Sequence, residues 1–133
     1  MQTFLPYPDF ARSAACLDRQ RLGKQRLECV QILRAIREGG GWANHPATKM
    51  WRGYEYWLEA YLQAIIDEWV SRGYKNNIPR PTVNLLCLAD MPPWLKNDRF
   101  HSAHRAALLF KNPEWYGQFN WTEEPKLEYW WPV

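Results

Sequence analysis

The chain has 133 residues, which is the length of one domain and is enough to build a core without disulfides or metals. Its nine Trp, seven Tyr and five Phe predict either an aromatic core or rings left outside for recognition. The net charge is +3, but residues 1–52 hold nine Lys and Arg against four acids, whereas residues 53–133 hold eight against ten. Positive charge in the first third favours a polyanionic partner, and a neutral or cationic substrate would not need it.

The cysteines and the hydropathy pattern argue against two further classes of protein. Cys16, Cys29 and Cys87 are odd in number and lack a CxxC spacing, so we expect reduced thiols and no disulfide framework. No apolar run approaches the roughly 20 residues of a membrane span, and the first residues lack the apolar core of a signal peptide. We therefore expect a cytoplasmic protein with no membrane contact.

The first residues are predicted to be extended. Pro6 and Pro8 disfavour a helix in residues 1–9, so we expect a short ordered lead-in that brings the first residue close to the first helices. A short helix is predicted from Phe10 to Leu17.

The most basic stretch, DRQRLGKQRLE, spans residues 18–28. It predicts a helix that Asp18 caps and that the glycines 39–41 end after Glu38. Gly23 lies inside this helix and predicts the close approach of another backbone, either the lead-in or a DNA strand. Helical spacing gives a polar face of Arg21, Lys24, Gln25, Glu28 and Gln31 and an apolar face of Leu22, Cys29, Leu33 and Ile36.

The polar face has two interpretations. It is either a solvated surface on which Glu28 pairs with Lys24, or a nucleic-acid surface that carries a catalytic carboxylate. Helical spacing alone does not separate them.

Two more helices are predicted. The longest apolar periodicity runs from Pro46 to Gly73 and predicts one core helix. Prolines break residues 75–93, leaving a short helix or extended piece at Val83–Leu88. A third helix is predicted from Asn97 or Asp98 to Phe110, with Phe100, Ala103, Ala107 and Phe110 inward and His101, His104 and Arg105 outward. The predicted fold is an all-α, compact single domain over residues 1–133, with about three main helices and an irregular aromatic C-terminal tail.

Several short motifs occur in a characteristic order. RQxLxxQxxE ends at Glu28, a histidine precedes the long helical stretch, and that stretch closes in Arg-Gly-Tyr. FHSAHR and a late Pro-x-Trp-Tyr follow. With these motifs the chain resembles the pyrimidine-dimer DNA glycosylase family, which includes a small phage ultraviolet-damage endonuclease. The closer likeness is to a bacterial branch that opens with QTFLPYPDF and carries NHPAxKMWRGYE.

The resemblance implies a DNA glycosylase with AP-lyase activity on damaged or modified pyrimidines in duplex DNA. It implies no cofactor or metal, no obligate protein partner, a monomer, and a location on the nucleoid in the cytoplasm. In this chemistry the N-terminal α-amine attacks the sugar, and Glu28 matches the family's acid. Because the bulk of Gln2 disfavours removal of the initiator, Met1 is the predicted nucleophile and Lys24 the reserve. Removal of Met1 would expose Gln2, which can cyclise and lose its amine.

The candidate DNA contacts are basic, amide and aromatic side chains of the matching motifs. His45 has a second interpretation as the cap of the core helix, and Trp115 and Tyr116 have a second interpretation as core packing. Leu27 stands where the family has a basic residue before its acid. The candidates are Arg19, Gln20, Arg21, Lys24, Gln25, Arg26, His45, Arg105, Trp115 and Tyr116.

Three alternatives are weighed against the enzyme. His101 and His104 at i and i+3 could begin a metal site, but no second pair completes it, so no metal is predicted. A non-catalytic DNA-binding module would use the same basic helix face. A protein-interaction domain would instead dock a partner on the aromatic tail.

Overall fold

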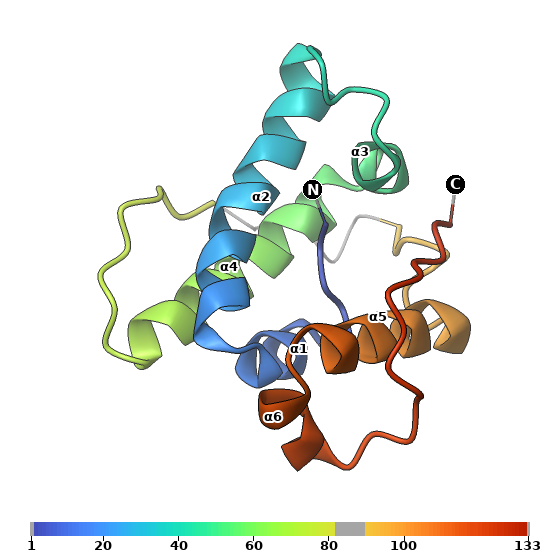
Figure 1. The fold of residues 1–133 in the computed structure, drawn as a ribbon. Coiled ribbons are helices and arrows are strands. Elements are labelled where there is room, and N and C mark those ends of the chain that lie inside the picture. The colour runs from blue at the N-terminus through green and yellow to red at the C-terminus, as the bar shows by residue number, and fades with distance from the viewer. Residues whose placement is uncertain (1, 82–89, 133) are drawn as a thin grey trace.

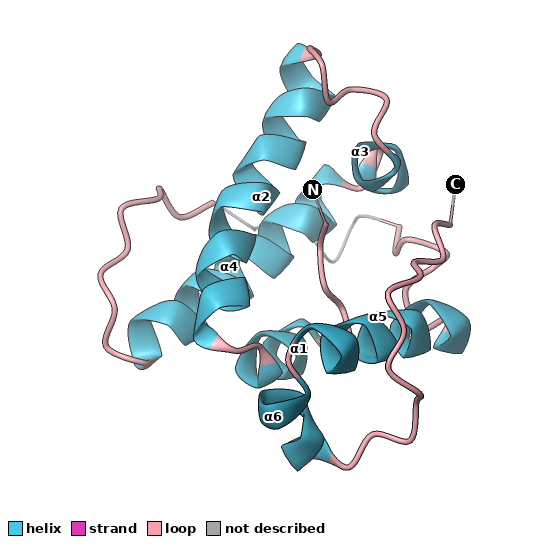
Figure 2. Ribbon diagram, in the orientation of Figure 1, coloured by secondary structure: helices cyan, strands magenta, loops and turns pink. Residues whose placement is uncertain are grey.

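A computed structural model describes residues 2–81 and 90–132. All regular secondary structure in these residues is helical, which confirms the all-α prediction (Figures 1 and 2). The piece predicted at Val83–Leu88 lies outside the described residues. The helices are α1 Phe10–Cys16, α2 Arg19–Glu38, α3 Pro46–Trp51, α4 Glu55–Ser71, α5 Asp98–Lys111 and α6 Pro113–Tyr116, followed by a 3₁₀ turn at Gly117–Phe119.

The helix predicted from Pro46 to Gly73 is two helices, α3 and α4, so this prediction was wrong. The chain turns between them at Gly53, whose φ of 90° lies in the left-handed region that favours glycine. The N–H of Gly53 donates to Oε1 of Glu55 at 3.1 Å, at the start of α4. The apolar periodicity continues across the break because both helices bury one face in the same core.

Helix α4 is central to the packing, because α1 and α2 both lie against it, and α3 packs on α2 (Figure 1). Aromatic side chains fill the core between these helices. The ring of Trp51 stacks on Tyr61 with 6.4 Å between centroids and meets the ring of Trp94 edge-on at 4.7 Å. None of the described helices is long and apolar enough to span a bilayer.

Helix α5 presents a different face to the core from the one predicted. His101 and His104 are 1% and 0% exposed, whereas Phe110 is 54% exposed, so the predicted orientation of these three residues was wrong. Phe100 and Ala107 are buried as predicted. The histidines turn inward because α5 lies against the amino-terminal segment, whose backbone groups need hydrogen-bonding partners.

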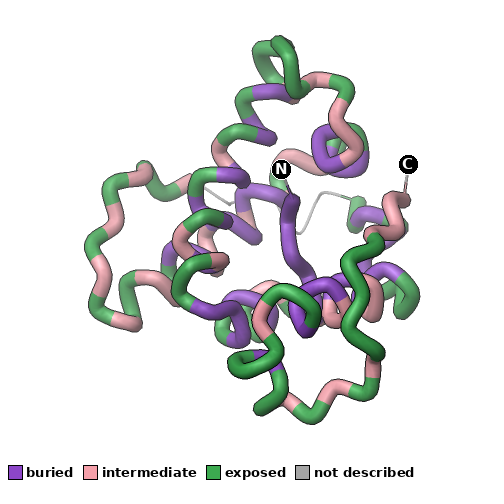
Figure 3. Tube along the Cα trace, viewed as in Figure 1, coloured by how far each residue is buried: buried purple, intermediate pink, exposed green. Residues whose placement is uncertain are grey.

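The amino-terminal segment, residues 2–6, is extended and buried (Figure 3). It runs from beside α2 toward α5, so the predicted ordered lead-in is confirmed for its described part (Figure 1). The C-terminal tail also follows α5, where the N–H of Lys126 donates to the carbonyl of Ala106 at 3.1 Å (Figure 1). Segments from both ends of the chain therefore lie against one helix.

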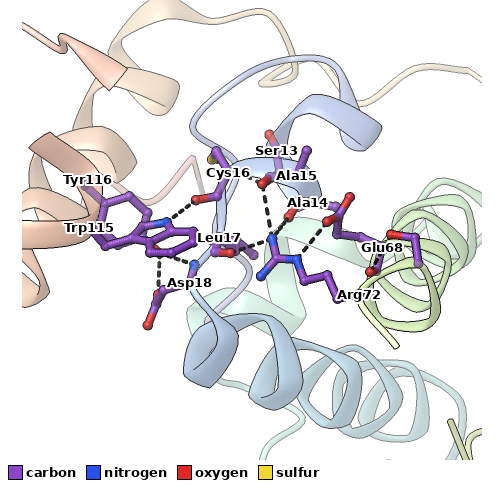
Figure 4. Close-up of polar contacts among 11 residues, drawn as sticks. Ser13, Ala14, Ala15, Cys16, Leu17, Asp18, Glu68, Arg72, Trp115 and Tyr116 are labelled. Carbon is purple, nitrogen blue, oxygen red and sulfur yellow. Dashed lines mark hydrogen bonds and ion pairs between the residues drawn. The ribbon is translucent and has the colours of Figure 1, made fainter. Parts of the chain in front are cut away.

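Arg72, directly after α4, holds the end of α1 (Figure 4). Its guanidinium donates to the carbonyl oxygens of Leu17 at 2.7 Å and Ala15 at 3.1 Å, and it reaches that of Ala14 at 3.5 Å. Its Nε pairs with Glu68 at 2.7 Å. The last carbonyls of a helix have no donor within the helix, so Arg72 satisfies them and ties α1 to α4.

Helix α6 binds the same turn from another side (Figure 4). The indole N–H of Trp115 donates to the carbonyl of Cys16 at 2.7 Å. The hydroxyl of Tyr116 donates to Oδ1 of Asp18 and accepts the Asp18 N–H at 3.1 Å. Asp18 precedes α2 as predicted, but its carboxylate bonds Tyr116 and Arg21 and caps no N–H of that helix.

Candidate active site

Glu28 lies in α2 with its carboxylate facing the amino-terminal segment. Its Oε2 accepts the backbone N–H of Gln2 at 2.9 Å, and its Oε1 lies 3.7 Å from Nζ of Lys24. The predicted pair with Lys24 is present, but the Glu28 side chain is only 11% exposed. This carboxylate is therefore not a solvated surface acid, because it is bonded to the first residues of the chain.

A cavity of about 330 Å³ opens beside Glu28. Its lining brings the cations Arg21, Lys24 and Lys111 around this single carboxylate. The volume is at the small end of ligand pockets, which span roughly 300 to 1,000 Å³. The excess of cations suits an anionic ligand such as a phosphodiester. The other lining residues are Gln2, Phe4, Gln20, Gln25 and Tyr129.

Gln25 holds the amino-terminal segment beside this cavity. Its Oε1 accepts the N–H of Phe4 at 2.8 Å, and its Nε2 donates to the carbonyl of Gln2 at 2.8 Å. Gln25 lies one helical turn before Glu28 and is 1% exposed. Together the two side chains bind the N–H and C=O of Gln2 and the N–H of Phe4.

Two histidines of α5 hold Leu5. Nδ1 of His104 accepts the N–H of Leu5 at 2.8 Å, and Nδ1 of His101 lies 2.7 Å from the Leu5 carbonyl oxygen. Nε2 of His101 accepts the N–H of Lys96 at 3.0 Å, so Nδ1 of His101 carries the proton and donates. Both rings are therefore neutral when they bind the segment.

The burial of His104 predicts a loss of stability in mild acid. Burial lowers the pKa of His104 to about 3, and His101 and Tyr129 are the titratable side chains beside it. In the unfolded chain the pKa returns to about 6.5. Below that value the unfolded state binds a proton that the folded state does not, so the stability present above pH 6.5 is lost as the pH falls. His104 alone should lower the free energy of unfolding by about 2 kcal/mol between pH 6.5 and pH 5.

Urea denaturation at pH 6.5 and pH 5 measures this loss. The variant His104→Asn keeps an acceptor near the position of Nδ1 but does not titrate, so it should lose about 2 kcal/mol less than the wild type. Equal losses in the two proteins would contradict the assignment.

The exposed candidates for DNA contact lie along one edge of α2. Arg19, Gln20 and Lys24 are exposed, and Gln20 and Lys24 line the cavity beside Glu28. Arg21 also lines the cavity and pairs with Asp18 at 3.0 Å. The structure thus brings together the basic residues of the first part of α2.

Trp115 is 37% exposed and lines a separate groove on this helix with Arg19, Gln20 and Lys24.

Arg26 turns into the fold. Its Nη1 donates to Oδ1 of Asn76 at 2.8 Å, and its guanidinium lies 4.4 Å from the ring centroid of Trp69. The same ring lies against Gly23, where an added Cβ would stand 3.0 Å from it. The close approach predicted at Gly23 is made by this tryptophan and not by a backbone, so that prediction was wrong.

Other candidates also serve the fold. Arg105 donates to the carbonyl of Pro6 at 2.7 Å and pairs with Glu123 at 2.9 Å. Nδ1 of His45 accepts the N–H of Ala47 at 3.0 Å, which confirms the capping interpretation. Tyr116 is fully buried, so its ring cannot stack on a base. The predicted DNA contacts whose side chains also make contacts within the fold include Arg21, Gln25, Arg26, His45, Arg105, Trp115 and Tyr116.

Sequence reasoning missed Lys111 and Tyr129 of the cavity, as well as Phe4 of the amino-terminal segment. Lys111 is the last residue of α5, and Tyr129 lies in the C-terminal tail. Burial raises the pKa of Tyr129, so its hydroxyl stays protonated. No local pattern marks Lys111 or Tyr129, because the cavity forms only when α2, α5 and both ends of the chain come together.

Cys16 and Cys29 are free thiols, as predicted, and both are buried. Burial raises the pKa of Cys16 to about 12, and it raises that of Cys29 still further. Neither supplies a thiolate nucleophile at neutral pH. Cys87 lies outside the described residues.

Comparison with known proteins decides the family. No curated protein and no solved structure matches the chain. The family model described as pyrimidine dimer DNA glycosylase matches residues 1–82, which is more than half of the chain. The chain belongs to the pyrimidine dimer DNA glycosylase family. Membership supports a DNA glycosylase-type function with DNA as the substrate.

The matched part of the chain contains the amino-terminal segment, α1, Glu28 and the rest of α2, and helices α3 and α4. Helix α5 lies outside the match. His101, His104 and Lys111 therefore come to the site from a part of the chain that the family match does not cover.

Proposed function

We propose that this glycosylase releases damaged or modified pyrimidines from duplex DNA and then cuts the strand as an AP lyase. The α-amine of Met1 is the proposed nucleophile, and Glu28 is the proposed acid–base group. The observation that carries the proposal is the 2.9 Å hydrogen bond from the Gln2 N–H to Oε2 of Glu28. Met1 lies outside the described residues. Standard bond lengths put the nitrogens of neighbouring residues about 3 to 4 Å apart, which supports an amine within reach of this carboxylate.

The proposed chemistry needs an uncharged amine. An α-amine has a pKa near 8 and is partly unprotonated at neutral pH, whereas a lysine side chain near 10.4 is almost wholly protonated. The amine nitrogen forms a bond to C1′ of the sugar as the bond from C1′ to the base breaks, and the base leaves with a proton. Opening of the sugar ring gives a cationic Schiff base.

Strand cleavage follows from that Schiff base. Loss of a proton from C2′ expels the 3′ phosphate by β-elimination, and water then hydrolyses the imine and frees the amine. Glu28 would exchange protons during ring opening and elimination, and its negative charge would stabilise the cationic intermediate.

The proposed DNA surface is the exposed edge of α2 together with the end of α5. Arg19, Lys24 and Lys111 supply positive charge, and Gln20 supplies an amide at the mouth of the cavity. Phosphate contacts of this kind position a duplex without reading its sequence. Trp115 is the aromatic side chain left for stacking at this edge.

Borohydride trapping tests the proposed function. Incubating the protein with duplex DNA that carries a pyrimidine dimer or an abasic site, in the presence of borohydride, should give a covalent protein–DNA adduct. A matched sample acylated near pH 6.5, where the α-amine reacts before lysines, should give none. Salt-sensitive binding to the duplex without any adduct would refute the enzyme and support a non-catalytic DNA-binding module.

A further inference from the structure

Most backbone hydrogen bonds of residues 2–6 run to side chains of three helices, and the exception is the Thr3 N–H, which bonds the Gln2 side chain. Backbone groups in a fold usually pair with other backbone groups, which supply about two-thirds of all hydrogen bonds. Here Glu28 of α2 accepts the N–H of Gln2, and Gln25 of α2 binds the C=O of Gln2 and the N–H of Phe4. Tyr61 of α4 donates to the Phe4 carbonyl. The α5 side chains that complete this cradle are His101, His104 and Arg105.

The cradle fixes the register of the segment and not only its direction. His101 and His104 are separated by one helical turn and bind the C=O and the N–H of the same residue, Leu5. Gln25 and Glu28, also one turn apart, bind both backbone groups of Gln2. A shift by one residue would break all four contacts, because alternate backbone groups of an extended chain point in opposite directions.

The surroundings of His104 show that its contact with Leu5 is specific. The ring is fully buried, and Nε2 has no hydrogen-bond partner among the described residues. An unpaired buried N–H costs free energy. The hydrogen bond from the Leu5 N–H to Nδ1 is the contact that offsets this cost. Phe4, Phe100 and Tyr129 surround the ring, and the Leu5 N–H is the donor that Nδ1 has among the described residues.

We infer that His101 and His104 are positioning residues, which hold Leu5 so that the chain start is delivered to Glu28. This inference rests on the proposed function, because the register matters for catalysis only if the chain start is the nucleophile. It assigns a role in the reaction to α5, which lies outside the family match.

Single-turnover trapping on abasic duplex DNA tests the inference with a pair of variants. His104→Leu removes the acceptor for the Leu5 N–H and should slow adduct formation at least tenfold, with the Kd for DNA within twofold of wild type. His104→Asn returns an acceptor close to the position of Nδ1 and should recover most of the rate. Leu108→Ala, a buried change on the same helix that removes no hydrogen bond to the segment, is the control for lost stability and should slow trapping less than twofold.

The variants also have a readout that does not depend on activity. Amide hydrogen exchange in the peptide covering residues 1–9 should rise in His104→Leu and stay near the wild-type level in His104→Asn and Leu108→Ala. If His104→Leu fails to fold, the pair His101→Leu and His101→Asn makes the same comparison through the Leu5 carbonyl.

The outcomes separate the two proposals. No adduct with the wild type would refute the proposed function and with it any catalytic role for the cradle. A wild-type adduct with equal trapping rates in His104→Leu and the wild type would refute only the positioning role. Equal slowing in His104→Leu, His104→Asn and Leu108→Ala would also refute it, because the loss would then follow stability and not the acceptor.

Discussion

Replacing Glu28 by Gln should slow base release from a dimer-containing duplex by about 100- to 10,000-fold, the usual contribution of a positioned acid–base group. The amide oxygen of Gln can still accept the Gln2 N–H that Glu28 Oε2 accepts at 2.9 Å, so the register of the segment is retained. What is lost is the negative charge beside the proposed Schiff base and the ability to exchange protons. Single-turnover assays on a defined lesion measure the effect, and circular dichroism confirms the fold.

Glu59→Gln is the matched control for this change. Glu59 is a buried glutamate of α4 that pairs with Arg37, and it does not line the cavity beside Glu28. Its substitution removes one buried negative charge as Glu28→Gln does, so it should leave base release within about threefold of wild type. A Glu28→Gln variant that releases the base as fast as Glu59→Gln would remove Glu28 from the mechanism.

Replacing Arg72 by Met should cause a large loss of stability although this side chain is partly exposed. The change removes the donors to the Leu17 and Ala15 carbonyls and the pair with Glu68. Hydrogen bonds from charged donors contribute about 1.5 to 3 kcal/mol each, so we expect a loss of about 3 kcal/mol. In a domain of this size that corresponds to a fall in Tm of roughly 10 °C.

Arg34→Met is the control for losing an arginine from a helix surface. Arg34 pairs with Glu38 at 3.8 Å, and both side chains are largely exposed. Exposed i,i+4 pairs contribute only about 0.3 to 0.5 kcal/mol, so its Tm should fall by 2 °C or less. If Tm falls by the same amount in Arg72→Met and Arg34→Met, the contacts of Arg72 with α1 do not stabilise the fold.

Local physical rules predicted the parts of this fold whose causes lie close in sequence. The C-terminal end of α2 follows from the glycines after Glu38, and the extended lead-in follows from its prolines. Asp18 precedes α2 as predicted, although it does not cap the helix through its side chain. Asn97 starts α5 as predicted, with its side chain accepting the N–H of Arg99. The pair between Lys24 and Glu28 follows from their spacing.

The errors arose where a distant segment determines the environment. Helical spacing alone cannot show that α5 would meet a buried extended segment, so His101 and His104 were predicted to face solvent. Apolar periodicity likewise continued through Gly53, because both flanking helices serve one core. The positive charge of Arg26 predicted a DNA contact, but this side chain lies over Trp69 and bonds Asn76.

The candidate site was predicted in part. Glu28 and the exposed edge of α2 follow from the motif and its helical spacing, and the segment's approach to Glu28 follows from an ordered lead-in. Lys111 and Tyr129 were not predictable, because they reach the cavity only through the packing of α5 and the tail. The use of Gln25 and both histidines to hold the backbone was also not predictable, since side chain to backbone contacts between distant segments leave no periodic pattern.

Locating the reduced bond in the borohydride-trapped adduct tests the central claim most directly. Nuclease digestion, proteolysis and tandem mass spectrometry identify the amine that carries the sugar remnant, and the intact mass shows which residue begins the mature chain. We predict that Met1 is retained and that the remnant is on its α-nitrogen. A remnant on the side chain of Lys24, or a mature chain that begins with cyclised Gln2 and still forms the adduct, would contradict this account.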